Sequence, residues 1–295
     1  MSRIQNHNRI WRDICQVNRL ACEYSYLGED KDIPILTAKN FFANPDLVTK
    51  FFEQGHWWEN GHNDMSDNLI RPGRSLYFHE EIMEWFAQPI VSGFKSLLGV
   101  ENIKVHSING NCFNGDMPLN NVLAAFPHTD IVGEFQSSPQ IAFNISLTKP
   151  TENTITNGDR VQTGFWSYEG KKTKLDFSFN DESKLEDFNQ YLQGTSNDST
   201  KWFQIDDYDP YKLEQIVTMD YNSLVAYPSH FLHNPYMKSH WFTDHDRLTI
   251  AGFLSVSPEE LNFEERFLED VSYAWEFFQI DKIHNFHPKK TKIID

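Results

Sequence analysis

A histidine and an aspartate one residue apart, His128 and Asp130, are residue types that can hold a catalytic metal ion. On a β-strand, residues i and i+2 point to the same side and lie about 6.6 Å apart, two rises of about 3.3 Å. A long imidazole and a short carboxylate in this arrangement can converge on one ion. The pair alone indicates a metal site only weakly, because a His-x-Asp triplet occurs by chance in many chains of this size.

A third candidate ligand, His233, follows the apolar segment 224–226 and the sequence Tyr-Pro-Ser. Two histidines and one carboxylate make the facial triad of non-haem iron(II) enzymes. This triad leaves three coordination positions open, as a bidentate 2-oxo acid and dioxygen require, whereas closed four-ligand zinc sites lack such a vacancy. We therefore expect His128, Asp130 and His233 to be the catalytic residues and to bind Fe(II).

Three other histidines compete with His233 for the third ligand position. His230 lies three residues earlier and would face the opposite side of a strand. His240 and His245 lie in an expected loop, nearer to Arg247. The spacing therefore favours His233.

Arg247 and Thr249 lie on the strand expected after His233. The distal carboxylate of 2-oxoglutarate must be held deep inside the fold, and a guanidinium can grip it with two parallel hydrogen bonds. Thr249 is two residues on, so it faces the same side and can donate a third bond. An arginine seen alone is more often part of a surface ion pair, but this one follows the His-x-Asp pair and a distal histidine on an apolar strand.

The order of these motifs resembles the 2-oxoglutarate/Fe(II)-dependent oxygenase superfamily, on its prolyl-hydroxylase-like branch. The resemblance covers about residues 68 to 255 and is similar in detail to an uncharacterised bacterial family of that branch. The segments that carry it are Arg71-Pro72-Gly73-Arg74, Pro127-His128-x-Asp130, residues 142–147, Thr163-Gly164-Phe165-Trp166, Asn222-Ser223-Leu224-Val225-Ala226-Tyr227-Pro228-Ser229-x-x-x-His233 and Arg247-x-Thr249.

The resemblance implies a dioxygenase that hydroxylates a C–H bond with release of succinate and CO2, using Fe(II), 2-oxoglutarate and O2. Its substrate would be a small molecule, an amino acid or a peptidyl residue. The implied residues are the iron ligands His128, Asp130 and His233, and the cosubstrate-binding residues Arg247, Thr249 and Asn144. Asn144 enters through the resemblance alone, as a polar contact on the strand after the His-x-Asp pair.

Two departures from the relatives concern the shape of the pocket. The piece 234–246 between His233 and Arg247 is longer than in many relatives, and Gln162-Thr163-Gly164 stands where relatives often have Gly-Gly-Thr. The segments 171–210 and 234–246 are candidate lids. Candidate walls of the pocket are Phe126, Phe165 and Trp166.

Apolar spacing and capping signals predict four helices. The expected helices are 44–52, 80–98 with a break or kink at Pro89, 181–193, and one that begins at Ser257 and runs to about 278. The rest of the first 100 residues has the pattern of loop. The expected strands are 121–126, 140–147, 164–168, 216–219, 223–227 and 248–256.

This order of helices, many strands and a final helix is typical of an α+β fold. We expect a double-stranded β-helix core of the jelly-roll or cupin-like kind, braced by N-terminal and C-terminal helices. Residues 1–295 would form a single oxygenase domain. It would comprise a mainly helical N-terminal support (1–99), the core (100–256) with an insertion at 171–210, and a C-terminal helix and tail (257–295).

The amino-acid composition limits the kinds of molecule that the protein is expected to bind. The 295 residues are 39% hydrophobic, enough for a sizeable core, and 26 basic against 42 acidic residues give a net charge of −16, which disfavours nucleic acid. The three cysteines form no Cys-x-x-Cys pair, so we expect free thiols and a cytoplasmic protein. The sequence has no apolar run of about 18 residues, so we expect no membrane span. The aromatic C-terminal pattern fits packing within the chain or against a partner, so it leaves the oligomeric state open.

Two alternatives remain. A cupin-like metalloenzyme that does not use 2-oxoglutarate would share the metal ligands but would not need Arg247, so Arg247→Ala would spare its activity. A non-catalytic β-sandwich binding protein would take up no iron, and His128 and Asp130 would be ordinary polar residues.

Overall fold

The fold is described from a computed structural model. It describes residues 13–19, 22–27, 33–54, 58–59, 74–77, 80–98, 101–113, 127, 140–152, 158–168, 170, 211–229, 231–237, 241–242 and 244–256.

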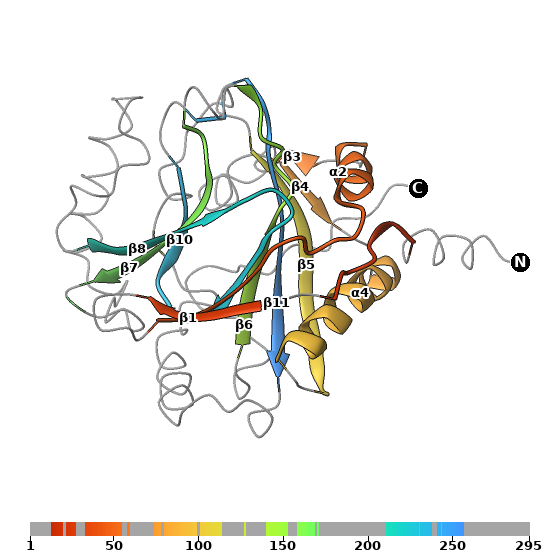
Figure 1. Cartoon of the computed structure of the whole chain (residues 1–295), viewed down its shortest axis with the longest axis horizontal. Coiled ribbons are helices and arrows are strands. Elements are labelled where there is room, and N and C mark those ends of the chain that lie inside the picture. Colours follow the sequence, from red (N-terminus) through yellow and green to blue (C-terminus); the bar gives the residue numbers. More distant parts are fainter. Residues whose placement is uncertain are drawn as a thin grey trace, which may run out of the picture.

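Two antiparallel sheets form the core of this part of the chain (Figure 1). The large sheet has eight strands, in the order β1 (Cys22–Leu27), β2 (Ile33–Ala38), β9 (Leu224–Pro228), β6 (Gln140–Ser146), β11 (Arg247–Val256), β5 (Ile103–Phe113), β4 (Arg74–Tyr77) and β3 (Trp58–Glu59). The small sheet has three, in the order β10 (His233–Tyr236), β7 (Val161–Tyr168) and β8 (Tyr211–Met219). Figure 1 shows the helices α2 (Pro45–Glu53) and α4 (Glu80–Leu98) beside the large sheet, on the side away from the small one.

The two faces of the large sheet pack into separate apolar clusters. Along β11, Leu248, Ile250 and Leu254 join buried residues of α2 and α4 in one cluster. Phe253 packs instead against the second cluster, which includes Phe165 of the small sheet. Because strand residues alternate in direction, the odd-numbered residues of β11 face the space between the two sheets. We call this space the interior.

The expected fold class, a double-stranded β-helix core braced by helices, is confirmed for the N-terminal brace and the core. The expected C-terminal helix from Ser257, the strand 121–126 and the insertion 171–210 with its helix lie outside the described residues. No helix among the described residues is long and apolar enough to cross a membrane. Cys15 and Cys112 are free and buried.

Two expectations for the N-terminal third need correction. The helix α4 runs without interruption from Glu80 to Leu98, so, of the break or kink expected at Pro89, the break does not occur. The stretch expected to be loop contributes the four strands β1 to β4, which form both ends of the large sheet. The bounds of α2 and of the strands β6, β7, β9 and β11 lie within three residues of the predicted ones, and β8 begins five residues earlier than predicted. The strands β5 and β10 were not predicted.

Asn222 ties the N-terminal segment to the centre of the large sheet. Its φ of 59° lies in the left-handed region, and its side chain is buried. The side-chain carbonyl accepts a hydrogen bond from the N–H of Phe42 (2.8 Å), and the amide donates to the Phe42 carbonyl (2.9 Å). Its own backbone carbonyl accepts from Phe41, and its N–H donates to Ser146.

Asn222→Gly is expected to lower the free energy of unfolding by about 2–3 kcal/mol, because two buried hydrogen bonds are lost at about 1–1.5 kcal/mol each. Asn222→Ala should cost about 1–2 kcal/mol more, because alanine also resists the left-handed conformation. Urea unfolding of the two variants measures both quantities. Equal stability of the glycine and alanine variants would contradict the role given to the backbone angle.

Candidate active site

The candidate site lies on the interior face of β11 and its neighbour β6. Thr249 pairs with Ser146, and Ala251 pairs with Asn144. Phe143 and Ile145 belong to the helix-side cluster, whereas Ala142 belongs to the interior one. The alternation therefore turns Asn144 and Ser146 to the interior, on the same face as Arg247 and Thr249.

Arg247 is a buried cation at the start of β11. Its residue is only 7% exposed, and its Nε has no hydrogen-bond partner among the described residues. Burial lowers the pKa of the guanidinium to about 10, and Tyr227 opposes this shift. A buried charge without an opposite charge is costly. Such a group suits a site that a ligand carboxylate completes.

Polar side chains surround the space that Arg247 faces. Ser146 is fully buried, and its Oγ has no hydrogen-bond partner among the described residues. Thr249 is 1% exposed. Across the same face, the amide of Asn144 donates to the hydroxyl of Tyr227 at 3.2 Å. These groups can hydrogen-bond a carboxylate held by the guanidinium.

His233 lies at the first position of β10, opposite Phe165 of β7, and is 4% exposed. Its Nδ1 lies 2.8 Å from the carbonyl oxygen of Phe231. A carbonyl can only accept, so Nδ1 carries the proton and Nε2 carries the lone pair. Metal-ligating histidines are typically oriented by such a bond from the other ring nitrogen.

Tyr227 links the histidine to the cosubstrate-binding candidates. Its ring packs edge-on against His233, with centroids 4.7 Å apart, and against Phe165 at 5.0 Å. Its hydroxyl accepts the hydrogen bond from Asn144, and Tyr227 opposes the lowering of the Arg247 pKa. One side chain thus connects the two ends of the candidate site.

The sequence-predicted site residues therefore divide into two groups. His233, Asn144, Arg247 and Thr249 meet around the interior, as the preceding distances and pairings show. His128 and Asp130 lie outside the described residues, although the adjacent Pro127 is buried. The rival ligands His230 and His240 also lie outside them, and His245 lies beside Asp244 ahead of β11.

Two expectations about the pocket are wrong. Trp166 follows Phe165 on β7, so it faces the other side of the small sheet, where its indole N–H donates to Asn234 at 2.8 Å. The expected lid 234–246 begins as the strand β10, and its residues Met237, Trp241 and Phe242 are buried. Met237, Trp241 and Phe242 are therefore core rather than cover.

Sequence reasoning gave no role to Ser146 or Tyr227. Tyr227 stands in the Tyr-Pro-Ser motif, and its alternation with Val225 was the available signal. Ser146 lies in the segment 142–147 but was given no role of its own, and its pairing with Thr249 reveals its place in the site.

No protein-family model matches this chain, and no curated protein matches its sequence. Among solved structures, HygX from Streptomyces hygroscopicus with nickel and 2-oxoglutarate bound is 14% identical, with a TM-score of 0.46 over 76% of this chain and 83% of that one. A prolyl hydroxylase from Trichoplax adhaerens, in complex with a hypoxia inducible factor peptide, is 11% identical, with a TM-score of 0.38 over 87% of this chain and 93% of that one.

A further similar structure is EctD from S. alaskensis with 2-oxoglutarate and 5-hydroxyectoine. It is 11% identical, with a TM-score of 0.36 over 75% of this chain and 72% of that one. Since these identities are low, the assignment of chemistry rests on the residues of the site.

Proposed function

We propose that this chain is an Fe(II)- and 2-oxoglutarate-dependent dioxygenase that hydroxylates a C–H bond of a small molecule, an amino acid or a peptidyl residue. His128, Asp130 and His233 would hold the iron, and Arg247 would bind the distal carboxylate of 2-oxoglutarate. The observation that carries the proposal is the buried guanidinium of Arg247, which lacks a carboxylate partner among the described residues and faces the same interior as His233.

The side chains proposed for the site suit both Fe(II) and 2-oxoglutarate. A facial triad of two imidazoles and one carboxylate suits iron(II) and leaves room for a chelating 2-oxo acid. The Oγ of Ser146 and the Nε of Arg247 have no hydrogen-bond partner within the part of the chain that the structure describes, and both suit a carboxylate, which accepts several hydrogen bonds at once. When bound, iron and 2-oxoglutarate would supply the oxidising chemistry, with succinate and CO2 as coproducts.

The chain itself would bind and orient the cosubstrate and would exclude water from the site. Arg247 would hold one carboxylate of the cosubstrate, and the hydroxyls of Thr249, Ser146 and Tyr227 would be available to hydrogen-bond it. Phe165 walls the space next to His233 with an apolar ring, its centroid 5.0 Å from that of Tyr227. A dry site of this kind protects a reactive intermediate from side reactions.

The test is anaerobic addition of Fe(II) and then 2-oxoglutarate to the full chain. A visible charge-transfer band should appear in the wild-type protein and be absent in His128→Ala. Succinate release under air, with candidate substrates, then identifies turnover. Iron binding without a band on adding 2-oxoglutarate would favour the cupin-like alternative, and no iron uptake would favour the binding protein.

A further inference from the structure

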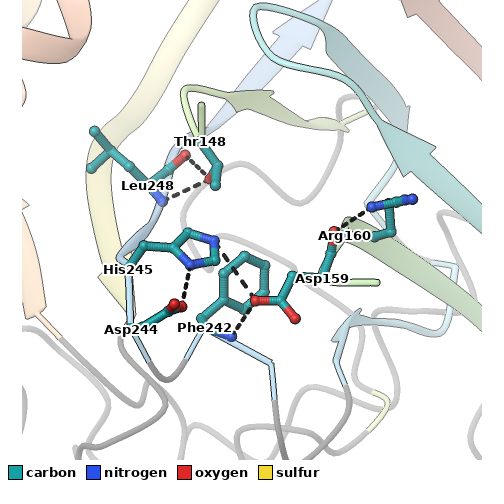
Figure 2. Close-up of polar contacts among 7 residues, drawn as sticks. All are labelled: Thr148, Asp159, Arg160, Phe242, Asp244, His245 and Leu248. Carbon is teal, nitrogen blue, oxygen red and sulfur yellow. Dashed lines mark hydrogen bonds and ion pairs between the residues drawn. The ribbon is translucent and has the colours of Figure 1, made fainter. Parts of the chain in front are cut away.

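A second group of ligand-type side chains lies away from the proposed iron site. Asp159 precedes β7, and Asp244 and His245 precede β11. One potential ligand atom from each of the three lies within 4.8 Å of the others. Figure 2 shows the imidazole of His245 between the two carboxylates, with the ring of Phe242 beside it.

The hydrogen bonds of His245 define the state of its ring. Nδ1 lies 2.8 Å from the carboxylate of Asp244, which accepts, so Nδ1 carries the proton. In the neutral ring, Nε2 then presents a lone pair. This atom is buried, without a hydrogen bond among the described residues, and lies 3.7 Å from Oδ2 of Asp159.

Asp159 is a buried carboxylate whose oxygens can accept more bonds than the described residues donate to them. Its side chain is fully buried, and Oδ2 accepts a hydrogen bond from the N–H of Phe242 at 2.9 Å. Oδ1 is buried and has no partner among the described residues. Arg160 donates to the backbone carbonyl of Asp159, not to its carboxylate. The carboxylate of Asp159 and Nε2 of His245, both electron-pair donors, therefore face each other at a short distance.

We propose that this group is a divalent transition-metal site of the zinc class, with Nε2 of His245 and the carboxylate of Asp159 as ligands. Zinc–nitrogen and zinc–oxygen bonds of about 2.0–2.2 Å span donor atoms up to about 4 Å apart. The observed 3.7 Å fits that span and exceeds the hydrogen-bond length that a protonated His245 would make to Asp159.

Asp244 binds the other ring nitrogen of His245, Nδ1. A carboxylate that accepts from the far nitrogen of a ligating histidine fixes the tautomer and raises the basicity of the ligand. The ring of Phe242 packs against one side of the imidazole, with its centroid 5.3 Å from that of His245. Water molecules would fill the other coordination positions.

This site is separate from the one proposed for iron. His233 pairs with Phe165, and Asp159 lies six residues before Phe165. Within β7 the four-residue step from Phe165 back to Val161 spans about 13 Å at about 3.3 Å per residue, and Asp159 lies before Val161. His245 also lies two residues before Arg247. A bound ion would therefore clamp the segment before β7 to the segment that leads into Arg247.

The test counts zinc bound to the full chain by equilibrium dialysis. His128→Ala, which disables the proposed iron site, should bind one zinc, and His128→Ala with His245→Gln should bind none. Asp244→Asn, in the same background, should weaken zinc about 10–100-fold, as the loss of such an outer partner typically does. Asp220→Asn removes an exposed acid and is the matched control, with no expected change.

Absence of zinc binding in His128→Ala, or an unchanged count after His245→Gln, overturns the proposal. Nitrogen NMR of His245 with both ring nitrogens protonated in the presence of zinc also overturns it, because the group would then be an ion-pair clamp. If His245→Gln does not fold, Asp159→Asn replaces it, since its amide oxygen still accepts from Phe242. Made singly in the otherwise wild-type chain, His245→Gln and Asp159→Asn should keep the charge-transfer band with Fe(II) and 2-oxoglutarate, so failure here is distinct from failure of the proposed function.

Discussion

Replacement of Arg247 by methionine is expected to raise the Kd for 2-oxoglutarate by about two to three orders of magnitude. Removal of one partner from a buried, hydrogen-bonded charge pair costs about 3–5 kcal/mol, and each 1.4 kcal/mol is tenfold in Kd. The side chain is buried, and its Nε has no partner in the described part of the chain, so the cosubstrate would be its counter-charge. Anaerobic titration of the charge-transfer band measures the Kd.

The same change should leave the protein without cosubstrate as stable as the wild type, or more stable. Methionine fills similar volume and removes a charge whose burial lowers its pKa to about 10. Lys39→Met, which removes an exposed positive charge, is the matched control and should leave the Kd unchanged. A Kd within about threefold of the wild type in Arg247→Met would reject the anchor and support the cupin-like alternative.

Replacement of His233 by alanine is expected to weaken Fe(II) binding by more than about 100-fold. Loss of an outer partner alone typically costs about 10–100-fold, and His233 is proposed as a direct ligand. The buried ring, held by the bond from Nδ1 to Phe231, presents Nε2 for coordination. Equilibrium dialysis with Fe(II) under anaerobic conditions gives the affinity.

Tyr236→Phe tests whether any change on β10 has the same effect. This residue shares the strand but packs against Trp166, on the face away from the interior. It should bind iron as the wild type does. If His233→Ala retains iron while His245→Gln loses it, the third ligand has been assigned to the wrong histidine.

The core strand β9 was predictable because its local composition reflects its burial, whereas the core strands β5 and β10 were not predicted. Residues 224–228 of β9 are all buried, and the apolar run 224–226 shows it. The strands β1 and β2 lack such a run, and Pro34 stands near the start of β2. Pro34 pairs with Tyr26 but lies outside the pairing of β2 with β9, which begins at Leu36, so it removes no bond from that ladder. Tertiary pairing therefore outweighs the local signal.

The site was predictable where spacing along one strand defines it. Arg247 and Thr249 share a face by alternation alone, and the structure places both in the interior. Ser146 comes from another strand, and its position depends on a register that links residues about a hundred apart in sequence. The prediction that Trp166 lines the pocket together with Phe165 was wrong for a different reason. Adjacent residues of a strand face opposite sides, and the prediction did not apply this rule to β7.

If Arg247 binds 2-oxoglutarate as proposed, the lifetime of the folded chain would also depend on cosubstrate supply. A ligand that binds only the folded state, present at 100 times its Kd, stabilises that state by about 2.7 kcal/mol. A shortage of 2-oxoglutarate would then enlarge the unfolded fraction that proteases remove. The abundance of the protein in a cell would follow the concentration of the small dicarboxylate that neutralises this charge.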